Sequence, residues 1–324
     1  MTEIYYYTVL EKEKDWRLDR WFKRQYPSIQ HSYLEKLFRT GQIRVEGKRI
    51  RGNYKLIPGQ KIRIPPFIKD MNNGPKKNSE TRVYPKELLK TIKENVLYCD
   101  DDILVLNKPS GIAVQGGSKL SYHIDMMLDE LKFGLHEKPK LVHRLDKDTS
   151  GVLVLARNIQ VASYLGNLFQ THTITKNYWA FIHGVPNQLK GNLSWSLTKK
   201  FVDQIKEKVT VDIEGDYADT YYEVIENIGK KFSWIILKPL TGRTHQLRVH
   251  CAAMGHPIIG DNKYGHDKFM LSEPFVKKLY LHARSISFIH PISKKEIKIQ
   301  APLPDYMVQL WNFFGLNDQL DYEI

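Results

Sequence analysis

Apolar residues along this chain fall mainly into short runs bounded by turn formers, a pattern typical of β-strands. The strand-like runs are rich in Val, Ile, Tyr and Phe and lie at residues 102–106, 152–156, 179–182, 220–225, 232–237, 285–289 and 296–299. Only a short turn ending at Gly229 separates the fourth run from the fifth. This spacing favours antiparallel pairing over parallel βαβ winding.

Helical periodicity in the same part of the chain is limited to residues 121–131, 160–169 and 244–254. The last segment places Leu247, Cys251 and Met254 on one face, with Thr244 as the predicted N-cap. Because strands outnumber helices, we predict an α+β fold with a mixed, mainly antiparallel sheet.

The N-terminal segment has a pattern of its own. Two helices are predicted, one on each side of Pro27, by apolar residues at helical spacing: Leu18, Trp21, Phe22, Leu34, Leu37 and Phe38. Short strands follow at residues 42–45, 48–50 and 61–64, the first two joined by a turn at Glu46 and Gly47.

Residues 71–94 carry turn formers and charges, interrupted by a short helical pattern at 85–93. We therefore expect a small domain at residues 1–70, a linker at 71–94 and a large domain at 95–324.

Positive charge is concentrated in the small domain. The chain of 324 residues has a formal net charge of +13. Between Arg17 and Arg63, thirteen Lys and Arg face three acids, which leaves about +3 for the rest. Such a surface favours a polyanion, although a merely solvated charged face remains an alternative. The candidate residues for contacting such a polyanion are Arg17, Lys36, Arg39, Arg44, Lys48, Arg49 and Lys55.

Other function classes find little support. Cys99 and Cys251 make no disulfide framework, and no metal-binding or nucleotide-binding motif occurs, so we expect no metal and no cofactor. No apolar run is long enough to cross a membrane, and the N-terminus has no leader-like segment. We expect a cytoplasmic, monomeric protein without membrane contact.

One carboxylate stands out in the large domain. Residues 141–151 read LVHRLDKDTSG, which places Asp146 on a loop between two apolar strands. Loops anchored in this way often carry catalytic groups, because the scaffold fixes them while the loop exposes them. The alternative is a turn aspartate that caps Thr149 or Ser150 through local hydrogen bonds.

This stretch resembles the HRLDxxTSG signature of the RluA/RluC-type pseudouridine synthases. Three more stretches fall in that family's order, namely NKPSG at 107–111, KNY at 176–178 and TGRTHQLRVH at 241–250, and a late LHA at 281–283 also matches. The resemblance covers residues 95–305. The N-terminal pattern resembles an S4 RNA-binding domain, and with this domain the chain is most similar to the RluC type.

The resemblance implies the pseudouridine-synthase fold, a bent sheet with the active cleft across its middle. It implies Asp146 as the catalytic carboxylate, Tyr178 stacked on uracil and Arg243 paired with Asp146. It further implies that Arg144 fills the stack vacated by a flipped base, and Leu281 is a candidate for the apolar side of the pocket. His143, His245 and His250 are interpreted as structural hydrogen-bonding groups.

By resemblance to the RluC type, the expected substrate and partner is large-subunit ribosomal RNA or its assembly intermediates. Two alternatives remain open. One is a related enzyme that modifies uridines of tRNA or at other rRNA positions. The other is a non-catalytic S4-type ribosome-binding protein, which has no need of Asp146, Tyr178 and Arg243 together. A protein kinase is excluded, because the HRLD spacing comes without a glycine loop or a DFG motif.

Overall fold

The computed structural model describes residues 4–68, 84–116, 122–202, 206–265, 271 and 273–320. The chain divides into two compact units, residues 1–83 and 84–324, and each has its own apolar core. Among the described residues, no helix is both long and apolar enough to span a membrane.

The first unit contains β1 (Tyr5–Thr8), η1 (Glu11–Glu13), α1 (Leu18–Gln25), α2 (His31–Arg39), β2 (Arg44–Val45), β3 (Lys48–Arg49) and β4 (Lys61–Ile64). Its strands form an antiparallel sheet in the order β1-β4-β2-β3. The six apolar residues that predicted the two helices are all buried. Glu46 and Gly47 both have positive φ, as the tight β2–β3 hairpin requires. β1 was not predicted, because its residues are mostly exposed and lack an apolar pattern.

The expected linker at residues 71–94 is only partly a connection. Residues 71–83 lie outside the described residues. The helical pattern at 85–93 forms α4 (Lys86–Glu94), which belongs to the second unit. Ile92 of α4 is fully buried and packs with Leu104 and Leu106. The end of the expected linker is therefore part of the large domain.

The described strands of the second unit are β5 (Val96–Cys99), β6 (Ile103–Lys108), β7 (Lys140–Leu141), β8 (Ser150–Ala156), β9 (Thr175–His183), β10 (Lys190–Val202), β11 (Lys206–Val211), β12 (Asp216–Ile228), β13 (Phe232–Pro239), β14 (Leu281–Ile289) and β15 (Glu296–Gln300). They form one sheet in the order β11-β10-β12-β13-β9-β14-β8-β6-β5, with β15 beside β14 and β7 beside β8. Among the described strands of this sheet, only β8 and β14 pair in parallel. The predicted α+β class with a mainly antiparallel sheet is confirmed.

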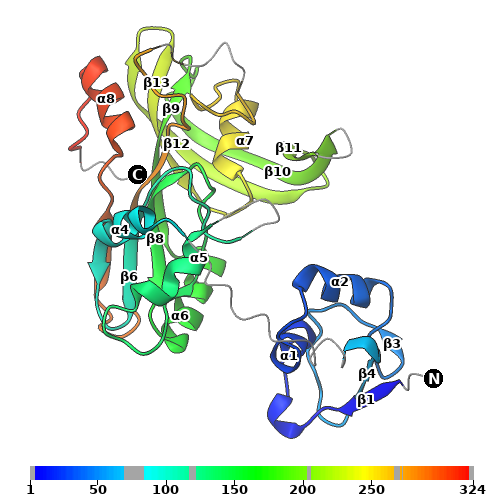
Figure 1. The fold of residues 1–324 in the computed structure, drawn as a ribbon. Helices are drawn as coiled ribbons and strands as arrows, with labels where there is room; N and C mark the ends of the chain where they lie inside the picture. The colour runs from blue at the N-terminus through cyan, green and yellow to red at the C-terminus, as the bar shows by residue number, and fades with distance from the viewer. Residues whose placement is uncertain are drawn as a thin grey trace. The chain divides into compact units, whose positions relative to one another are not determined.

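The sheet has two halves that meet at one narrow contact. β8 pairs with β14 only at Ser150 and Gly151, opposite His282 and Ala283. Beyond this point β14 pairs with β15. In Figure 1, β6 and β8 lie in one half, and β9, β10, β12 and β13 lie in the other. The segments that lead into this contact are the loop before β8 and the first residues of β14.

The described helices of the second unit are α4, α5 (Ile124–Met127), η2 (Leu128–Leu131), α6 (Ile159–Gln170), α7 (Gln246–Ala253) and α8 (Asp305–Phe314). α7 and α8 cover opposite faces of the larger half of the sheet (Figure 1). Side chains alternate along β9, so Trp179 and Phe181 pack against α8 while Ala180 and Ile182 share a core with α7. Tyr178 lies on the α7 face by the same alternation.

Several elements of this unit differ from prediction. Residues 121–131 form a short α-helix and a 3-10 turn instead of one helix, with residue 121 outside the described part. β10 and β11 were not predicted, although Leu193, Trp195 and Leu197 alternate with polar residues in β10. α8 was also missed. Its buried residues complete the core around Trp179, a role that only the folded sheet creates.

Candidate active site

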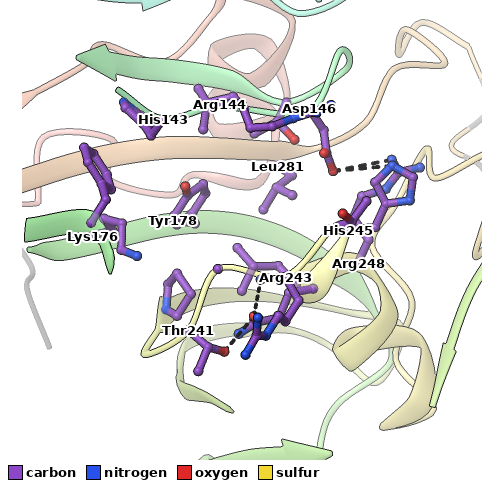
Figure 2. A pocket seen from close by; sticks show the side chains of 18 of the residues that line it. His143, Arg144, Asp146, Lys176, Tyr178, Thr241, Arg243, His245, Arg248 and Leu281 are labelled. Atoms are coloured by element: carbon purple, nitrogen blue, oxygen red, sulfur yellow. Dashed lines mark hydrogen bonds and ion pairs between the residues drawn. The ribbon is translucent and has the colours of Figure 1, made fainter. Parts of the chain in front are cut away.

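A pocket of about 370 Å³ opens beside the junction of the two half-sheets. It is lined by the loop between β7 and β8, by β9, by the segment that joins β13 to α7, and by Leu281 at the start of β14. Figure 2 shows Asp146, Tyr178, Arg144, Arg243 and Leu281 around it. All five site residues expected in the large domain therefore line one pocket.

Asp146 lies on the loop between β7 and β8, as its sequence context predicts. Its carbonyl oxygen accepts a hydrogen bond from the Thr149 amide at 3.2 Å. Among the described residues, no backbone amide or hydroxyl group donates a hydrogen bond to its carboxylate. The alternative, an aspartate that caps Thr149 or Ser150 through its side chain, is therefore wrong. The carboxylate instead faces the pocket and the side chains of Arg248 and His245 (Figure 2).

A buried lysine forms hydrogen bonds with the backbone of this loop. Lys108 is 0 % exposed, and its Nζ donates to the carbonyl oxygens of Pro109 and Ile112 at 2.9 Å each and of Lys147 at 3.1 Å. Burial lowers the pKa of Lys108 to about 7, against the opposing influence of nearby aspartates. Because Lys147 adjoins Asp146, this ammonium fixes the loop that carries the carboxylate. Lys108 belongs to the NKPSG motif, but the motif by itself did not predict a role for this lysine.

Gly151 allows the two half-sheets to meet directly after the loop. Its φ is +107°, and a Cβ at this position would lie 2.2 Å from the carbonyl oxygen of Ala283 on β14. Only glycine fits this backbone conformation at such a close approach. The Thr-Ser-Gly turn that follows Asp146 thus has a steric cause.

The cation that faces Asp146 from α7 is Arg248. Its NH1 lies 3.8 Å from Asp146 Oδ2, and His245 Nε2 lies 3.9 Å from the same oxygen. The Arg248 guanidinium also donates two hydrogen bonds of 2.7 Å to the carboxylate of Asp261. This bidentate contact fixes the plane of the guanidinium and directs NH1 toward Asp146.

Electrostatics keep Asp261 and Arg248 ionised. Burial favours the neutral form of Asp261, but hydrogen bonds from Arg248 and from the amides of Lys263 and Tyr264 outweigh it and hold its pKa below the usual range. Burial also opposes the charge of Arg248, yet its pKa is raised by Asp261 and, more weakly, by Asp146. His245 has a lowered pKa, chiefly from burial, and its Nδ1 lies 2.7 Å from the Tyr264 hydroxyl.

The expected pairing of Arg243 with Asp146 is wrong. Arg243 Nε donates to the carbonyl oxygen of Tyr217 at 3.0 Å, and its NH1 lies 3.9 Å from Asp216. Gln246 causes this placement, because its Oε1 accepts the Arg243 amide at 2.9 Å and holds the segment before α7 against β12. The helix begins at Gln246, two residues after the predicted start, so Arg248 faces Asp146 instead.

Tyr178 and Leu281 form the apolar part of the pocket. Leu281 is 2 % exposed, and Tyr178 is half-buried on β9 between Asp146 and Lys176 (Figure 2). Burial, with a smaller contribution from the charge of Asp146, raises the pKa of Tyr178. The hydroxyl is therefore protonated at neutral pH, and the ring is available to pack against a planar base.

The remaining charged side chains of the pocket lining are basic. Arg144 and Arg243 are exposed, while Lys176 is half-buried two residues before Tyr178 on the same face of β9. Lys176 is the first residue of the KNY motif, but the motif by itself did not predict a role for it. The period of two along a strand, together with Tyr178, was the signal that placed it on the pocket face.

The three histidines make the hydrogen bonds expected of structural groups. His143 Nε2 accepts the Val154 amide at 2.8 Å, and its ring stacks on Phe169. His250 Nδ1 lies 3.1 Å from Thr220 Oγ1. Burial lowers the pKa of His143 to about 3 and that of His250 to about 4, so both are neutral near pH 7. His245 also lies close to Asp146, so it belongs to the site as well.

A cluster of Asp100, Asp102 and His290 has the composition of a metal site. Its atoms are already engaged, since His290 Nδ1 accepts the amides of Ile292 and Ser293 and its Nε2 donates to Asp100 at 3.0 Å. Asp100 also accepts the Tyr98 hydroxyl at 2.5 Å. This donor set serves to close the β5–β6 turn and offers no free imidazole lone pair to a metal.

In the N-terminal unit, all seven predicted RNA-contacting side chains are exposed: Arg17, Lys36, Arg39, Arg44, Lys48, Arg49 and Lys55. Arg17, Arg39 and Arg49 line one hollow on this unit. Arg17 is paired with Asp19 at 2.6 Å, and Arg44 donates to the carbonyl oxygens of Gly41 and Gly47. The geometry leaves most of these cations directed to solvent.

Comparisons with known proteins agree on one family. Residues 102–253 match the family described as RNA pseudouridylate synthase. "Ribosomal large subunit pseudouridine synthase C" of Rickettsia conorii (strain ATCC VR-613 / Malish 7) is 36% identical over 299 residues, which cover 90% of this chain and 95% of that protein. The protein of the same name from Buchnera aphidicola subsp. Schizaphis graminum (strain Sg) is 37% identical over 301 residues, covering 91% and 93%.

Solved structures give the same result for the fold. The structure titled "Human RNA Pseudouridylate Synthase Domain Containing 4" superposes with a TM-score of 0.60 at 30% identity, covering 71% of this chain and 97% of that one. "Human RNA Pseudouridylate Synthase Domain Containing 1" gives 0.55 at 26% identity, with 74% and 100% covered.

Proposed function

The chain belongs to the RNA pseudouridylate synthase family, and from this premise we propose that it isomerises specific uridines of large-subunit ribosomal RNA. The family makes it an enzyme that converts uridine in RNA to pseudouridine. The name shared by the bacterial relatives, "Ribosomal large subunit pseudouridine synthase C", supports the choice of RNA. We infer that it acts in the cytoplasm as a monomer.

The reaction breaks the bond between N1 and C1′, rotates the uracil and joins C5 to C1′, after which C5 loses a proton and N1 gains one. It is an internal rearrangement that neither oxidises nor reduces the nucleotide. It therefore requires a carboxylate beside the sugar and a pocket that keeps the detached uracil in place. Asp146 is the proposed nucleophile or ion-pairing carboxylate beside the sugar and base. A flipped uracil fits between Tyr178 and Leu281, with Arg144 at the mouth of the pocket.

One observation carries the proposal. Asp146 lies in the pocket with an arginine at 3.8 Å that a second carboxylate, Asp261, holds in place. A fixed cation favours the negative charge of a carboxylate that faces it, and this attraction is stronger when a bound base excludes water. Arg248 therefore takes the positioning role that we expected of Arg243 from the family resemblance.

The N-terminal unit supports an RNA substrate. Its exposed cations form a surface suited to the phosphate backbone, which contributes affinity without selecting a base. We propose that this unit is an S4-like RNA-binding module. In this arrangement the module anchors ribosomal RNA while the large domain acts on the flipped uridine.

The test is tritium release from C5-labelled uridine in large-subunit rRNA transcripts, with tRNA as a comparison substrate. Asp146→Asn should lose activity by at least about a thousandfold with RNA affinity nearly unchanged. Asp148→Asn is the matched control, because Asp148 is an exposed carboxylate of the same loop that does not line the pocket. We expect this control to stay within about threefold of wild type.

Activity of Asp146→Asn within about tenfold of wild type removes the residue from the catalytic role. Release from tRNA alone contradicts the ribosomal assignment. No release from any RNA leaves the alternative of a non-catalytic RNA-binding protein. Mapping of pseudouridines in rRNA from cells with and without the gene then identifies the modified positions.

A further inference from the structure

Lys176 is a desolvated cation in the pocket, and no residue that the structure describes forms an ion pair or a side-chain hydrogen bond with it. We propose that it binds a phosphodiester of the target nucleotide or of its immediate neighbour, and so positions the flipped uridine over Tyr178. The inference rests on the proposed function, since it requires an RNA substrate. It adds a phosphate subsite next to Tyr178 on β9.

The strand geometry fixes where Lys176 lies. Lys176 and Tyr178 are two residues apart on β9, so both side chains are on the pocket face, while Asn177 between them is buried on the other. Figure 2 shows Tyr178 between Lys176 and Asp146. The lysine therefore lies on the far side of the Tyr178 ring from the carboxylate.

Lys176 lacks the contacts that normally accompany a buried ammonium. Among the described residues, no carboxylate lies within ion-pair distance of its Nζ and no acceptor receives a hydrogen bond from it. Burial lowers its pKa, and no neighbouring charge appears among the causes of that shift. Asp146 raises the pKa of Tyr178 but has no such effect on Lys176, which agrees with their placement at opposite ends.

The surroundings of Lys176 add positive charge. Its charge lowers the pKa of His143, after the larger effect of burial. The pKa of His172 is lowered by partial burial, by Lys176 and then by Arg243, so both cations lie near that ring. The Nε2 atom of His143 accepts a hydrogen bond from a backbone amide, so the ring is neutral there and does not offset the charge of Lys176. Among the described residues, Lys176 therefore has positive charge nearby and no carboxylate within ion-pair distance.

An anionic ligand resolves this imbalance. A desolvated charge without a partner is costly, and a charge-assisted hydrogen bond to a phosphate oxygen offsets that cost far better than a neutral uracil carbonyl. A flipped nucleotide brings its own flanking phosphates to the mouth of the pocket. Asp146 is not available to Lys176, because it faces Arg248 and His245 at the other end.

The test uses the full chain and an RNA fragment with one mapped target uridine. Each phosphodiester within two nucleotides of that uridine is replaced in turn by a neutral methylphosphonate, and RNA affinity is measured for wild type and Lys176→Met. We expect one replacement to weaken wild-type binding by about tenfold, as loss of a charged hydrogen bond does. Lys176→Met should be weakened to the same degree on unmodified RNA and should be insensitive to that replacement.

Lys140→Met is the matched control. Lys140 is also half-buried, but it pairs with Glu137 and does not line the pocket, so its variant should keep the wild-type methylphosphonate pattern. Lys176→Gln repeats the experiment with a neutral polar side chain. Thermal melting confirms that the variants are folded, and Lys176→Met should melt no lower than wild type because it removes an unpaired charge.

The outcomes are distinct. Wild type that forms no pseudouridine on unmodified RNA contradicts the proposed function itself. Wild type that is active, while both Lys176 variants keep its methylphosphonate sensitivity, overturns the phosphate subsite. A Lys176→Met protein that binds normally but has lost turnover also overturns it, because the lysine then acts in the chemistry. Two Lys176 variants that both melt far below wild type show a structural lysine and overturn the proposal as well.

Discussion

Arg248 faces Asp146 at 3.8 Å while both hydrogen bonds of its guanidinium go to Asp261, so one guanidinium links two carboxylates of different character. Asp261 is buried and makes the short bidentate bonds, whereas Asp146 lies in the open pocket at a longer distance. The looser contact leaves the Asp146 oxygens accessible to a substrate. The tighter contact keeps the cation from following the substrate.

The first prediction compares two arginines. Arg248→Lys keeps the charge but loses the planar fork, so it cannot hold Asp261 and face Asp146 together. We expect turnover to fall by about a hundredfold, the scale of a misplaced catalytic group, with RNA affinity little changed. Arg243→Lys should change turnover by less than about fivefold, because Arg243 does not contact Asp146. Single-turnover kinetics of both variants decide; equal losses contradict the assignment of Arg248.

Tyr178→Phe separates two roles of the ring. The variant keeps the face that packs on uracil but loses the hydroxyl, which is protonated at neutral pH because burial and Asp146 raise its pKa. If the hydroxyl carries a proton in the reaction, the rate of tritium release should fall by about a hundredfold or more, with unchanged affinity. A variant that works at the wild-type rate shows that Tyr178 is only a wall of the pocket.

Gly151→Ala should destabilise the large domain rather than alter chemistry directly. The added Cβ would lie 2.2 Å from the Ala283 carbonyl oxygen, and the positive φ of +107° disfavours any residue with a side chain. We expect a loss of several kcal/mol in the free energy of unfolding, as for other changes that strain a fixed backbone. Urea unfolding measures it, and a loss below about 1 kcal/mol contradicts the steric explanation.

Stability of the large domain should fall in acid. Burial lowers the pKa of His143 and His282 to about 3 and that of His250 to about 4, whereas an unfolded histidine has a pKa near 6.5. Between about pH 6.5 and 4 the unfolded state therefore binds more protons, so the free energy of unfolding decreases as pH falls.

Urea unfolding of a chain that begins at Tyr84, measured from pH 7 to 4.5, tests this expectation. His250→Gln, which removes one of the three histidines, should give a shallower decrease than wild type. A free energy of unfolding that stays constant over this range contradicts the neutral buried histidines.

Removal of residues 1–83 should separate anchoring from chemistry. The apolar cores of the two units share no described residue, so the chain from Tyr84 is expected to fold. It loses the concentrated positive charge between Arg17 and Arg63, so RNA affinity should fall and depend less on salt. Pseudouridine formation should persist at high enzyme and RNA concentrations, since the proposed catalytic residues lie in the second unit.

Affinity at two salt concentrations, combined with single-turnover rates, measures both effects. An unchanged salt dependence contradicts the anchoring role. An insoluble or unfolded remainder shows instead that the first unit serves mainly to fold the second.

Local pattern in the sequence accounts for much of this site. The apolar runs on both sides of Asp146 placed it on a loop between strands, and the period of two along β9 placed Tyr178 on one face. The ordered motifs identified the family before any geometry was known. These features depend on residues close together in the chain, and short-range patterning records them directly.

Long-range geometry decided the rest. The choice of Arg248 over Arg243 depends on where α7 begins and on how Gln246 ties it to β12, which no local pattern encodes. Lys108 is buried, and Lys176 has no ion-pair partner among the described residues, because of how elements far apart in sequence pack together. The sequence by itself therefore determined which residues gather at the pocket, and only the tertiary structure decided which of them pair, because ion pairs and burial depend on the packing of whole elements.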